Sequence, residues 1–243
     1  SDLSFEDQFI NRVAAKLAYT EYQHQELEGG GVGTQFNNDM FETRFDFYHA
    51  EVNGWKGAWT VHYKSSDFKA AGEEAFTPPS KTDSVALAWL EEKHFDDVLV
   101  QFGARVEKVK LKAYLEEGEH HHEEEDHDEH EDEMHEEEVE LKTQNFTPVS
   151  VSLGAVWDYQ PGYNLGVSFT FSQRAPSASE LFSKGPHIGT STYEVGALYD
   201  IHVEDDEIHI ELGDQKVNVE TSYNADITWR KFEGDFGFVV SAF

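Results

Sequence analysis

The stretch Phe41-Glu42-Thr43-Arg44-Phe45-Asp46-Phe47 alternates Phe41, Thr43, Phe45 and Phe47 with the charged Glu42, Arg44 and Asp46. Successive side chains of a β-strand point to opposite faces, so this pattern predicts a strand with one apolar and one polar face. No convincing helical periodicity competes with it. The same alternation recurs along the chain, over residues 13–19, 59–63, 98–106, 151–159, 165–171, 223–229 and 236–242.

The polar faces of these segments carry many charged and amide side chains. They include Arg44, Asp46, Gln101, Arg105, Glu107, Asp158, Asn224 and Asp226. So many charges without partners cannot fill a dry core. They therefore face solvent outside a β-sandwich, or line the wet lumen of a barrel whose apolar face contacts lipid.

The connections between the segments favour the barrel, because short and long connections strictly alternate. Turn-like connections lie at 52–54, 94–97, 160–162 and 233–235, and long polar ones at 27–35, 70–82, 116–142 and 174–216. In an antiparallel sheet this places all long loops at one end and all tight turns at the other. Bacterial outer-membrane barrels have this topology, with short periplasmic turns and long extracellular loops.

Aromatic residues gather near the predicted tight turns. They are Trp55, Trp59, Phe95, Trp157, Tyr159, Tyr163, Trp229, Phe232 and Phe236. In a barrel they would form the aromatic girdle at the periplasmic interface. The alternative is that they pack in the core of a soluble β-protein.

The predicted fold is all-β, an antiparallel up-and-down transmembrane β-barrel with long extracellular loops. Strands are expected over residues 9–26, 36–51, 55–69, 83–94, 98–115, 144–159, 163–174, 217–230 and 235–243, with another near 192–200. Several exceed the roughly 9–11 residues that cross a bilayer at a tilt, so hairpins should project beyond the membrane. About ten strands indicate a partial barrel. The outer, lipid-facing side chains are expected to include Phe41, Phe45, Trp59, Val61, Val100, Phe102, Leu165 and Phe169.

Composition sets outer bounds on the function. The chain has 243 residues, a formal net charge of −31 and no cysteine. The charge excludes a general nucleic-acid binder, which needs clustered Lys and Arg to neutralise phosphates. The absence of cysteine fits a bacterial envelope. No apolar run is long enough for a membrane helix and no signal peptide opens the sequence, so the chain is either mature or a piece of a longer protein.

The segment 116–140 is the most unusual in composition. It holds six histidines among sixteen carboxylates, without Lys, Arg or Cys: His120, His121, His122, His127, His130 and His135. Imidazole and carboxylate ligands suit borderline divalent cations such as zinc, whereas the lack of thiolates argues against a closed structural zinc site. The segment is expected to be mobile without metal and to bind several ions weakly. The alternative is a solvated acidic loop that tolerates histidine.

Enzymatic motifs are absent from the sequence. It contains no Gly-x-Ser-x-Gly, no phosphate-binding loop, no Gly-x-Gly-x-x-Gly before a helix and no His-Glu-x-x-His on a helical pattern. The chain is therefore not expected to be an enzyme.

Several later motifs resemble a known family. The run Phe171-Ser172-Gln173-Arg174-Ala175-Pro176-Ser177-Ala178-Ser179-Glu180-Leu181-Phe182, followed by 185–190 and 193–196, resembles the late-barrel signature of TonB-dependent outer-membrane receptors. The stretch Glu220-Thr221-Ser222-Tyr223-Asn224 is similar to the Glu-x-Ser-x-Asn entry to the next strand in that family. The segments 22–29 and 72–79, together with the histidine-rich loop, are similar to its zinc-uptake subgroup.

The resemblance covers nearly the whole chain and implies its organisation. Residues 1–243 would be the receptor barrel portion, with a His/acid-rich extracellular loop at 116–142 and a second long extracellular loop at 175–216. It implies a bacterial outer-membrane location, contact with outer-membrane lipid, and energy input from the TonB system through a plug domain. Nothing in this chain resembles that plug or the TonB box, and an acidic insertion at 197–216 replaces the run expected before Glu220.

Beyond the loop histidines, three residues are the candidates for a firmer metal site. His24 and Glu26 lie two apart on a strand near the long-loop end, so their side chains share a face. His187 follows Gly185-Pro186, a backbone setting suited to a fixed position. His202 and His209 fall in a predicted hairpin, 200–211, that reads more simply as solvated, whereas His49, His62 and His94 are expected to be structural.

The predicted function is therefore uptake of zinc, as transported ligand, or of a similar divalent cation. Neutral imidazole is the ligand form, so capture should weaken as the pH falls through about 6.5. One alternative is a receptor of the same family for a metal chelate or haem. Another is a soluble acidic β-protein that buffers divalent metal.

Overall fold

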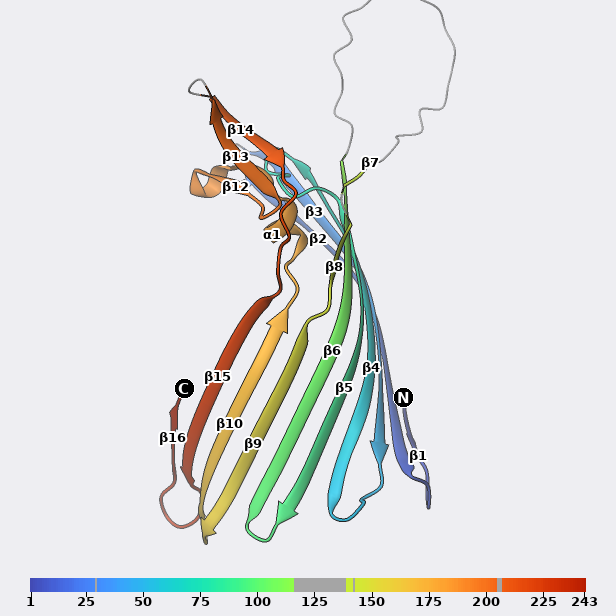
Figure 1. The fold of residues 1–243 in the computed structure, drawn as a ribbon, viewed down its shortest axis with the longest axis vertical. Coiled ribbons are helices and arrows are strands. Elements are labelled where there is room, and N and C mark those ends of the chain that lie inside the picture. Colours follow the sequence, from blue (N-terminus) through green and yellow to red (C-terminus); the bar gives the residue numbers. More distant parts are fainter. Residues whose placement is uncertain (29, 116–138, 142, 205–206) are drawn as a thin grey trace, which may run out of the picture.

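The computed structural model describes residues 1–28, 30–115, 139–141, 143–204 and 207–243. Within these residues one antiparallel sheet of twelve strands forms a curved wall (Figure 1). Its strands are β1 (Asp2–Ser4), β2 (Ile10–Glu28), β3 (Gly31–His49), β4 (Trp55–Gly72), β5 (Ser80–Phe95), β6 (Val98–Leu115), β7 (Val139–Glu140), β8 (Gln144–Phe146), β9 (Val149–Gln160), β10 (Tyr163–Arg174), β15 (Glu220–Lys231) and β16 (Phe238–Ala242).

Strand order follows sequence order, β1-β2-β3-β4-β5-β6-β9-β10-β15-β16, with β7 and β8 paired to the upper part of β6. In the described residues β1 and β16 are the two edges of the sheet and do not pair with each other. The predicted up-and-down partial barrel is confirmed. The described part of the chain contains no helix that is both long and apolar enough to cross a membrane.

The tight turns that follow β3, β5 and β9 lie at one end of the wall and the longer connections at the other, where β2 (to Glu28) and β3 (from Gly31) are also joined by a short connection (Figure 1). The β3–β4 turn shows why the sequence turns there. Asn53 and Gly54 both have positive φ, 52° and 82°, and Val52 and Trp55 exchange two backbone hydrogen bonds of 3.0 Å across them. This is the Asn-Gly two-residue hairpin turn, which needs left-handed backbone at both central positions.

The strand register places the alternating side chains on two distinct faces. Phe45 pairs with Val61, Val61 with Leu87, Leu87 with Val106 and Val106 with Val149, so one apolar row crosses five strands. The eight side chains expected to face lipid all fall on this outer face. Phe41, Phe45, Trp59, Val61 and Phe169 are also exposed in the isolated chain, as lipid contact requires.

The opposite, inner face carries a network of polar contacts. Arg44 Nε donates to Asp46 at 2.8 Å, and the Thr60 hydroxyl donates to the same carboxylate at 2.6 Å. His62 Nε2 lies 2.8 Å from Glu42, and an Arg105 guanidinium nitrogen lies 3.4 Å from His62 Nδ1. Several charged groups on this face are therefore paired with one another, and a water-filled lumen can solvate the polar groups of such a face.

At the loop end of the sheet, the chain between β10 and β15 folds into a cap (Figure 1). The cap is defined here as the described residues of 175–219. It contains α1 (Ala178–Phe182), β11 (Lys184–His187), the 3₁₀ turn η1 (Ile188–Thr190), β12 (Thr192–Val195), β13 (Tyr199–Glu204) and β14 (Glu207–Leu212). β11 pairs with β12 and β13 with β14, each as a hairpin separate from the main sheet.

The cap has a hydrophobic core against the inner face of β6. Leu181, Phe182 and Leu198 from the cap are at most 1% exposed. They cluster with side chains of β6 and its neighbours: Val109, Leu111, Ala113, Leu141 and Phe146. The long loop at 175–216 thus contains packed structure and not only polar chain.

Three expectations about strand boundaries need correction. Strands β2 and β3 run to Glu28 and from Gly31, so no long loop spans 27–35. The strand expected over 144–159 is divided into β8 and β9 at Thr147-Pro148, because proline cannot donate to a sheet hydrogen bond. The strand expected near 192–200 is instead β12 and the start of β13, which lie in the cap hairpins.

Candidate functional site at the loop end of the sheet

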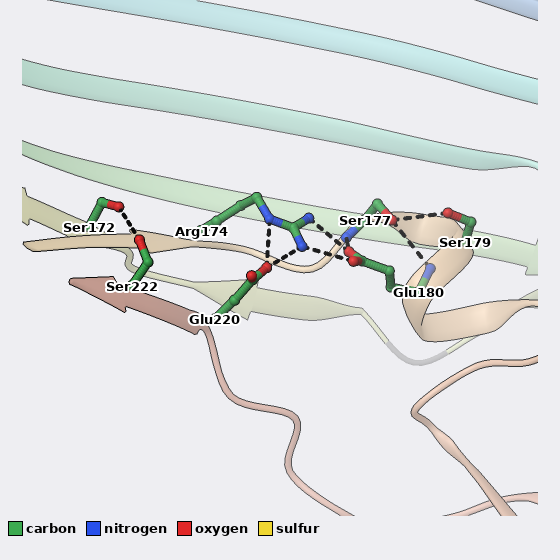
Figure 2. Close-up of polar contacts among 7 residues, drawn as sticks. All are labelled: Ser172, Arg174, Ser177, Ser179, Glu180, Glu220 and Ser222. Carbon is green, nitrogen blue, oxygen red and sulfur yellow. Dashed lines mark hydrogen bonds and ion pairs between the residues drawn. The ribbon is translucent and has the colours of Figure 1, made fainter. Parts of the chain in front are cut away.

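Arg174, the last residue of β10, joins three segments at the loop end (Figure 2). Its guanidinium donates to both carboxylate oxygens of Glu180 in α1, at 2.9 and 2.8 Å. It also donates through Nε to Glu220, the first residue of β15, at 2.9 Å, with a second contact from Nη2. One side chain therefore ties the entry and the exit of the cap to its first helix.

Glu180 also caps α1. Its carboxylate accepts a hydrogen bond from Ser177 N at 2.7 Å, while the Ser177 hydroxyl accepts one from Glu180 N at 3.2 Å. This reciprocal capping box satisfies backbone donors that a helix N-terminus leaves free. The hydrogen bonds from Arg174, followed by that from Ser177, lower the pKa of Glu180 to about 2.

The cap is also tied to the β4–β5 connection, residues 73–79. The Glu74 carboxylate, in a residue only 4% exposed, accepts a hydrogen bond from Gly189 N at 2.9 Å. The buried hydroxyls of Thr77 and Ser183 lie 2.9 Å apart, and Lys184 N donates to Phe76 O at 2.7 Å. A Cβ at Gly185 would come within 2.7 Å of Phe76 Cβ, so glycine permits this close approach.

A cavity of about 460 Å³ lies on the inner face of the sheet, beside residues 173–179. Hydroxyl and amide groups dominate its polar lining, with two cationic side chains and one carboxylate: Asn38, Ser66, Thr77, Ser80, Thr82, Ser84, Gln173, Ser177, Ser179, Lys64, Arg174 and Glu107. A cavity of this kind offers hydrogen bonds to an oxygen-rich solute.

The three candidates for a firmer metal site lie on two elements of the loop end, β2 and β11. His24, on β2, stacks on Phe36 with ring centroids 4.5 Å apart. Glu26 lies two residues further on β2 and is exposed. His187 ends β11, lies 5.4 Å from the Phe76 ring, and places Nδ1 3.6 Å from a Glu194 oxygen.

Within the described residues no three His, Asp or Glu side chains are gathered closely enough to hold a metal ion. His24, Glu26 and His187 are thus not brought together as one ligand set, and their role in metal binding stays a prediction. The six loop histidines, His120 to His135, lie outside the described residues.

The expected hairpin at 200–211 is present as β13 and β14. His202 is the direct cross-strand partner of His209, with Asp200 opposite Glu211 and Glu204 opposite Glu207. All six side chains share one face, because direct partners in an antiparallel pair point the same way. The other face carries Ile201, Val203, Ile208 and Ile210.

The histidines expected to be structural lie away from the cap. His62 belongs to the inner polar network. His49, near the tight turns, has a side chain only 5% exposed, with Nε2 2.9 Å from Glu91 and Nδ1 2.7 Å from Ala50 O. His94 is exposed next to the β5–β6 turn. Histidines of the described residues therefore include hydrogen-bonded groups with little exposure, such as His49, and exposed ones, such as His94 and the two on β13–β14.

Sequence reasoning missed the roles of Arg174, Glu180 and Glu74. The spacing Ser177-x-x-Glu180 is a capping-box signature and could have identified the start of α1. No sequence signal shows that Glu74 reaches Gly189, because that contact joins residues 115 apart.

Comparisons with known proteins agree with this architecture. The family model described as TonB dependent receptor-like, beta-barrel matches residues 1–243. Among solved structures, the chain is similar to one titled Copper transporter OprC, with a TM-score of 0.57 and 10% sequence identity. The alignment covers 99% of this chain and 45% of that chain, so this chain spans less than half of that protein's length. At this identity the likeness concerns the fold.

Proposed function

Because the chain belongs to the TonB-dependent receptor β-barrel family and lies in the bacterial outer membrane, we propose that it is part of a receptor that takes up zinc or a similar divalent cation. The family consists of transport receptors and not enzymes. Energy for release into the periplasm would come from the TonB system through a plug domain. Membership in this family argues against the alternative that the chain is a soluble protein that buffers divalent metal.

One observation carries the choice of metal. The β13–β14 hairpin holds two imidazoles directly opposite each other, with carboxylates above and below them on the same face. Direct partners have Cβ atoms about 4.5–5.5 Å apart, within reach of one shared cation after side-chain rotation. Neutral imidazole together with carboxylate oxygen suits zinc and its neighbours.

The composition of 116–140 also supports a divalent cation such as zinc, and the name of the similar structure supports metal uptake in general. Six histidines among sixteen carboxylates could concentrate cations near the receptor mouth. The similar solved chain is titled as a copper transporter, which supports metal uptake in general without choosing zinc. Ions collected by the loops would pass to firmer ligands, for which His24, Glu26 and His187 remain the candidates.

Calorimetric titration of the full-length protein with zinc chloride tests this proposal. The double change His202→Gln with His209→Gln should weaken one binding step by about ten-fold or more, since two ligands are lost. His94→Gln, an exposed histidine at the other end of the sheet, is the matched control. Deleting residues 118–138 should remove several weak sites and leave the hairpin step in place. Unchanged zinc binding in both variants would overturn the proposal.

The inner cavity favours a second candidate, uptake of a metal chelate. Its hydroxyl groups and the Lys64 ammonium group suit an oxygen-rich chelator that carries negative charge. The other charged lining groups have partners within the chain, Arg174 with Glu180 and Glu220, and Glu107 with Arg105 at 3.1 Å. Lys64→Gln should then weaken binding of a zinc–citrate complex and leave binding of free zinc unchanged. If the original protein and the Lys64→Gln variant bind the zinc–citrate complex equally, this candidate is excluded.

A further inference from the structure

Two ionisable side chains lie on the outer, lipid-facing side of the sheet near the tight turns. Glu91 on β5 is the direct cross-strand partner of Phe102 on β6 and lies two residues beyond Trp89, so it shares the outer face with both. Its side chain is only 13% exposed, and that of His49, its partner at 2.9 Å, is 5% exposed. Carboxylates are rare where lipid excludes water, so an ionisable group on this face indicates a functional site.

The sheet is built to bring these two groups together. Glu91 is also the direct partner of Gly57 on β4, and a Cβ at position 57 would come within 2.7 Å of Glu91 Cδ and 2.1 Å of Leu90 O. Glycine therefore lets the carboxylate cross β4 and reach His49 at the end of β3. Trp89 adds a further contact, since its Nε1 donates to Glu91 Oε1 at 2.8 Å.

The Glu91 carboxylate is satisfied at one oxygen only. Both His49 and Trp89 contact Oε1, whereas Oε2 is buried and has no hydrogen-bond partner among the described residues. An ionised carboxylate can accept from about four donors, and a buried oxygen without a donor costs free energy. This position therefore suits a hydrogen-bond donor from outside the chain, above all a cationic one.

A cavity of about 470 Å³ adjoins this carboxylate and has aromatic walls. Glu91 and His49 line it together with five aromatic side chains: Phe9, Trp55, Trp59, Trp89 and Phe102. The faces of indole and phenyl rings attract cations, and a carboxylate beside them adds a charge-assisted hydrogen bond. The lining of this cavity therefore suits an ammonium group.

The cavity continues into an apolar groove toward the middle of the outer face. A second cavity of about 550 Å³ shares Trp59 and Trp89 with the first. It is otherwise lined mainly by outward apolar side chains, among them Val61, Leu87 and Val106, which belong to the row assigned to lipid contact. A molecule with an ammonium group at one end and a hydrocarbon chain at the other fits the two cavities together.

We propose that the aromatic pocket, defined as Glu91 and the five aromatic side chains around it, binds a phospholipid with a primary ammonium headgroup. The ammonium donates to Glu91 Oε2 and lies against the indole rings, while one acyl chain occupies the groove. A small rotation about the last bond of the Glu91 side chain, which is a soft torsion, turns Oε2 toward the pocket.

The position of the pocket assigns the lipid to one leaflet. The lining includes Val52 and Asn53 of the β3–β4 turn, and short turns of outer-membrane barrels are periplasmic. The lipid therefore belongs to the periplasmic leaflet. The pocket lies on the opposite face from the inner cavity and at the opposite end from the cap, so it does not depend on the proposed metal uptake.

Lipid binding by the full-length protein in detergent tests the proposal. Native mass spectrometry counts bound phosphatidylethanolamine, phosphatidylcholine, whose ammonium has no N–H donor, and phosphatidylglycerol, which has no cation. Phosphatidylethanolamine should bind about ten-fold or more tighter than either, as one hydrogen bond between charged groups provides. Phosphatidylcholine or phosphatidylglycerol bound as tightly as phosphatidylethanolamine would overturn the proposal, because the pocket would then not recognise the primary ammonium.

Glu91→Gln keeps the shape of the side chain and removes its charge. The preference for phosphatidylethanolamine over phosphatidylcholine should then fall to near one. Glu92→Gln is the matched control, since Glu92 is the next residue of β5, lies on the inner face and accepts from Gln101 Nε2 at 3.0 Å. A preference that survives in Glu91→Gln, or an equal loss in both variants, would contradict the role of Glu91.

Fluorescence of the pocket tryptophans gives a second measurement that leaves Glu91 unchanged. Brominated acyl chains quench tryptophan at short range. A small fraction of brominated phosphatidylethanolamine in phosphatidylcholine vesicles should therefore quench the protein more than the same fraction of brominated phosphatidylcholine. The excess should disappear in the double variant Trp59→Phe and Trp89→Phe and remain in Trp157→Phe, a 50% exposed tryptophan outside the pocket. Equal quenching by the two brominated lipids would show that no amine lipid gathers at the pocket, and the proposal would be wrong.

Discussion

The lower and upper halves of β6 bury opposite faces of the same strand. Below residue 107 the outward side chains are apolar and the inward ones, such as Gln101 and Arg105, are polar. Above it the inward Val109, Leu111 and Ala113 are at most 7% exposed, while the outward positions are lysines. The strand is continuous, so the difference comes from what covers each face: lipid outside the lower half and the cap inside the upper half.

This comparison explains the position of the cap residues. A strand presents an apolar face wherever water is excluded, whether by lipid or by protein. Leu181 and Phe182 exclude water from the inner face, as the membrane does from the outer face lower down. Changes on one half should therefore leave the other half largely intact, and three variants examine this independence.

The largest effect is expected in the core of the cap. Phe182 is fully buried, and Phe182→Ala should destabilise the cap by about 3–5 kcal/mol through lost burial and a cavity. Hydrogen exchange should then accelerate in α1, β11 and β12 and stay slow in β9 and β10. Ile188→Ala, at a residue 46% exposed, is the control. Faster exchange throughout the wall would show that the two halves are one cooperative unit.

The next effect concerns the lipid-facing half. Phe169→Lys places a charge on the outer face and should cost about 2–4 kcal/mol if it lies near the bilayer midplane. Thr170→Lys, one residue further on the inner face, should cost far less because that face is polar. Urea unfolding in lipid vesicles compares them. Similar costs would contradict the assignment of the two faces.

The smallest effect concerns the link between the halves, the Arg174 cluster. The pKa of Glu180 is lowered from its ordinary 4.5 to about 2, so its contribution to stability is complete above pH 4.5 and is lost as the pH falls towards 2. Because the Glu180 side chain is 47% exposed, solvent screening limits that contribution to about 1 kcal/mol or less.

The contribution of Glu180 to the stability of the cap is measured by hydrogen exchange of α1 at a series of pH values, after correction for the intrinsic exchange rate. Arg174→Gln should abolish the extra loss of protection between pH 4.5 and 2. Arg12→Gln, which breaks a similar exposed ion pair with Asp2 at the tight-turn end, should leave α1 unchanged. A retained acid transition in Arg174→Gln would mean that another group controls the cap.

Much of the wall could be predicted from sequence because strand side chains alternate with a fixed period of two. Once Phe45 and Val61 are assigned outward, every second residue follows, and the register confirms the eight expected outer residues. The Asn53-Gly54 turn was equally readable, since few residues tolerate positive φ. Strand ends were less accurate: β2 and β3 stay paired beyond Glu26, where neither lipid nor a turn residue marks a limit.

The candidate site was less accessible to sequence reasoning. The hairpin face with His202 and His209 could be predicted because polar and apolar residues alternate over 200–211. The capping box could be recognised from the Ser177-x-x-Glu180 spacing. The contacts of Glu74 with Gly189 and of Thr77 with Ser183 join connections far apart in the chain. A five-residue helix and four-residue strands are too short to show a period of their own.

The sequence by itself determined the strand class, the two faces, the tight turns and the family, because each depends on residues close together in the chain. Only the tertiary structure decided that the loop at 175–216 packs inward on β6 and that Arg174 joins its two ends. It alone decided that the Glu91 carboxylate crosses Gly57 to reach His49. Those features depend on which strands are neighbours and in what register, and hydrogen bonding and packing fix that register only when the whole sheet forms.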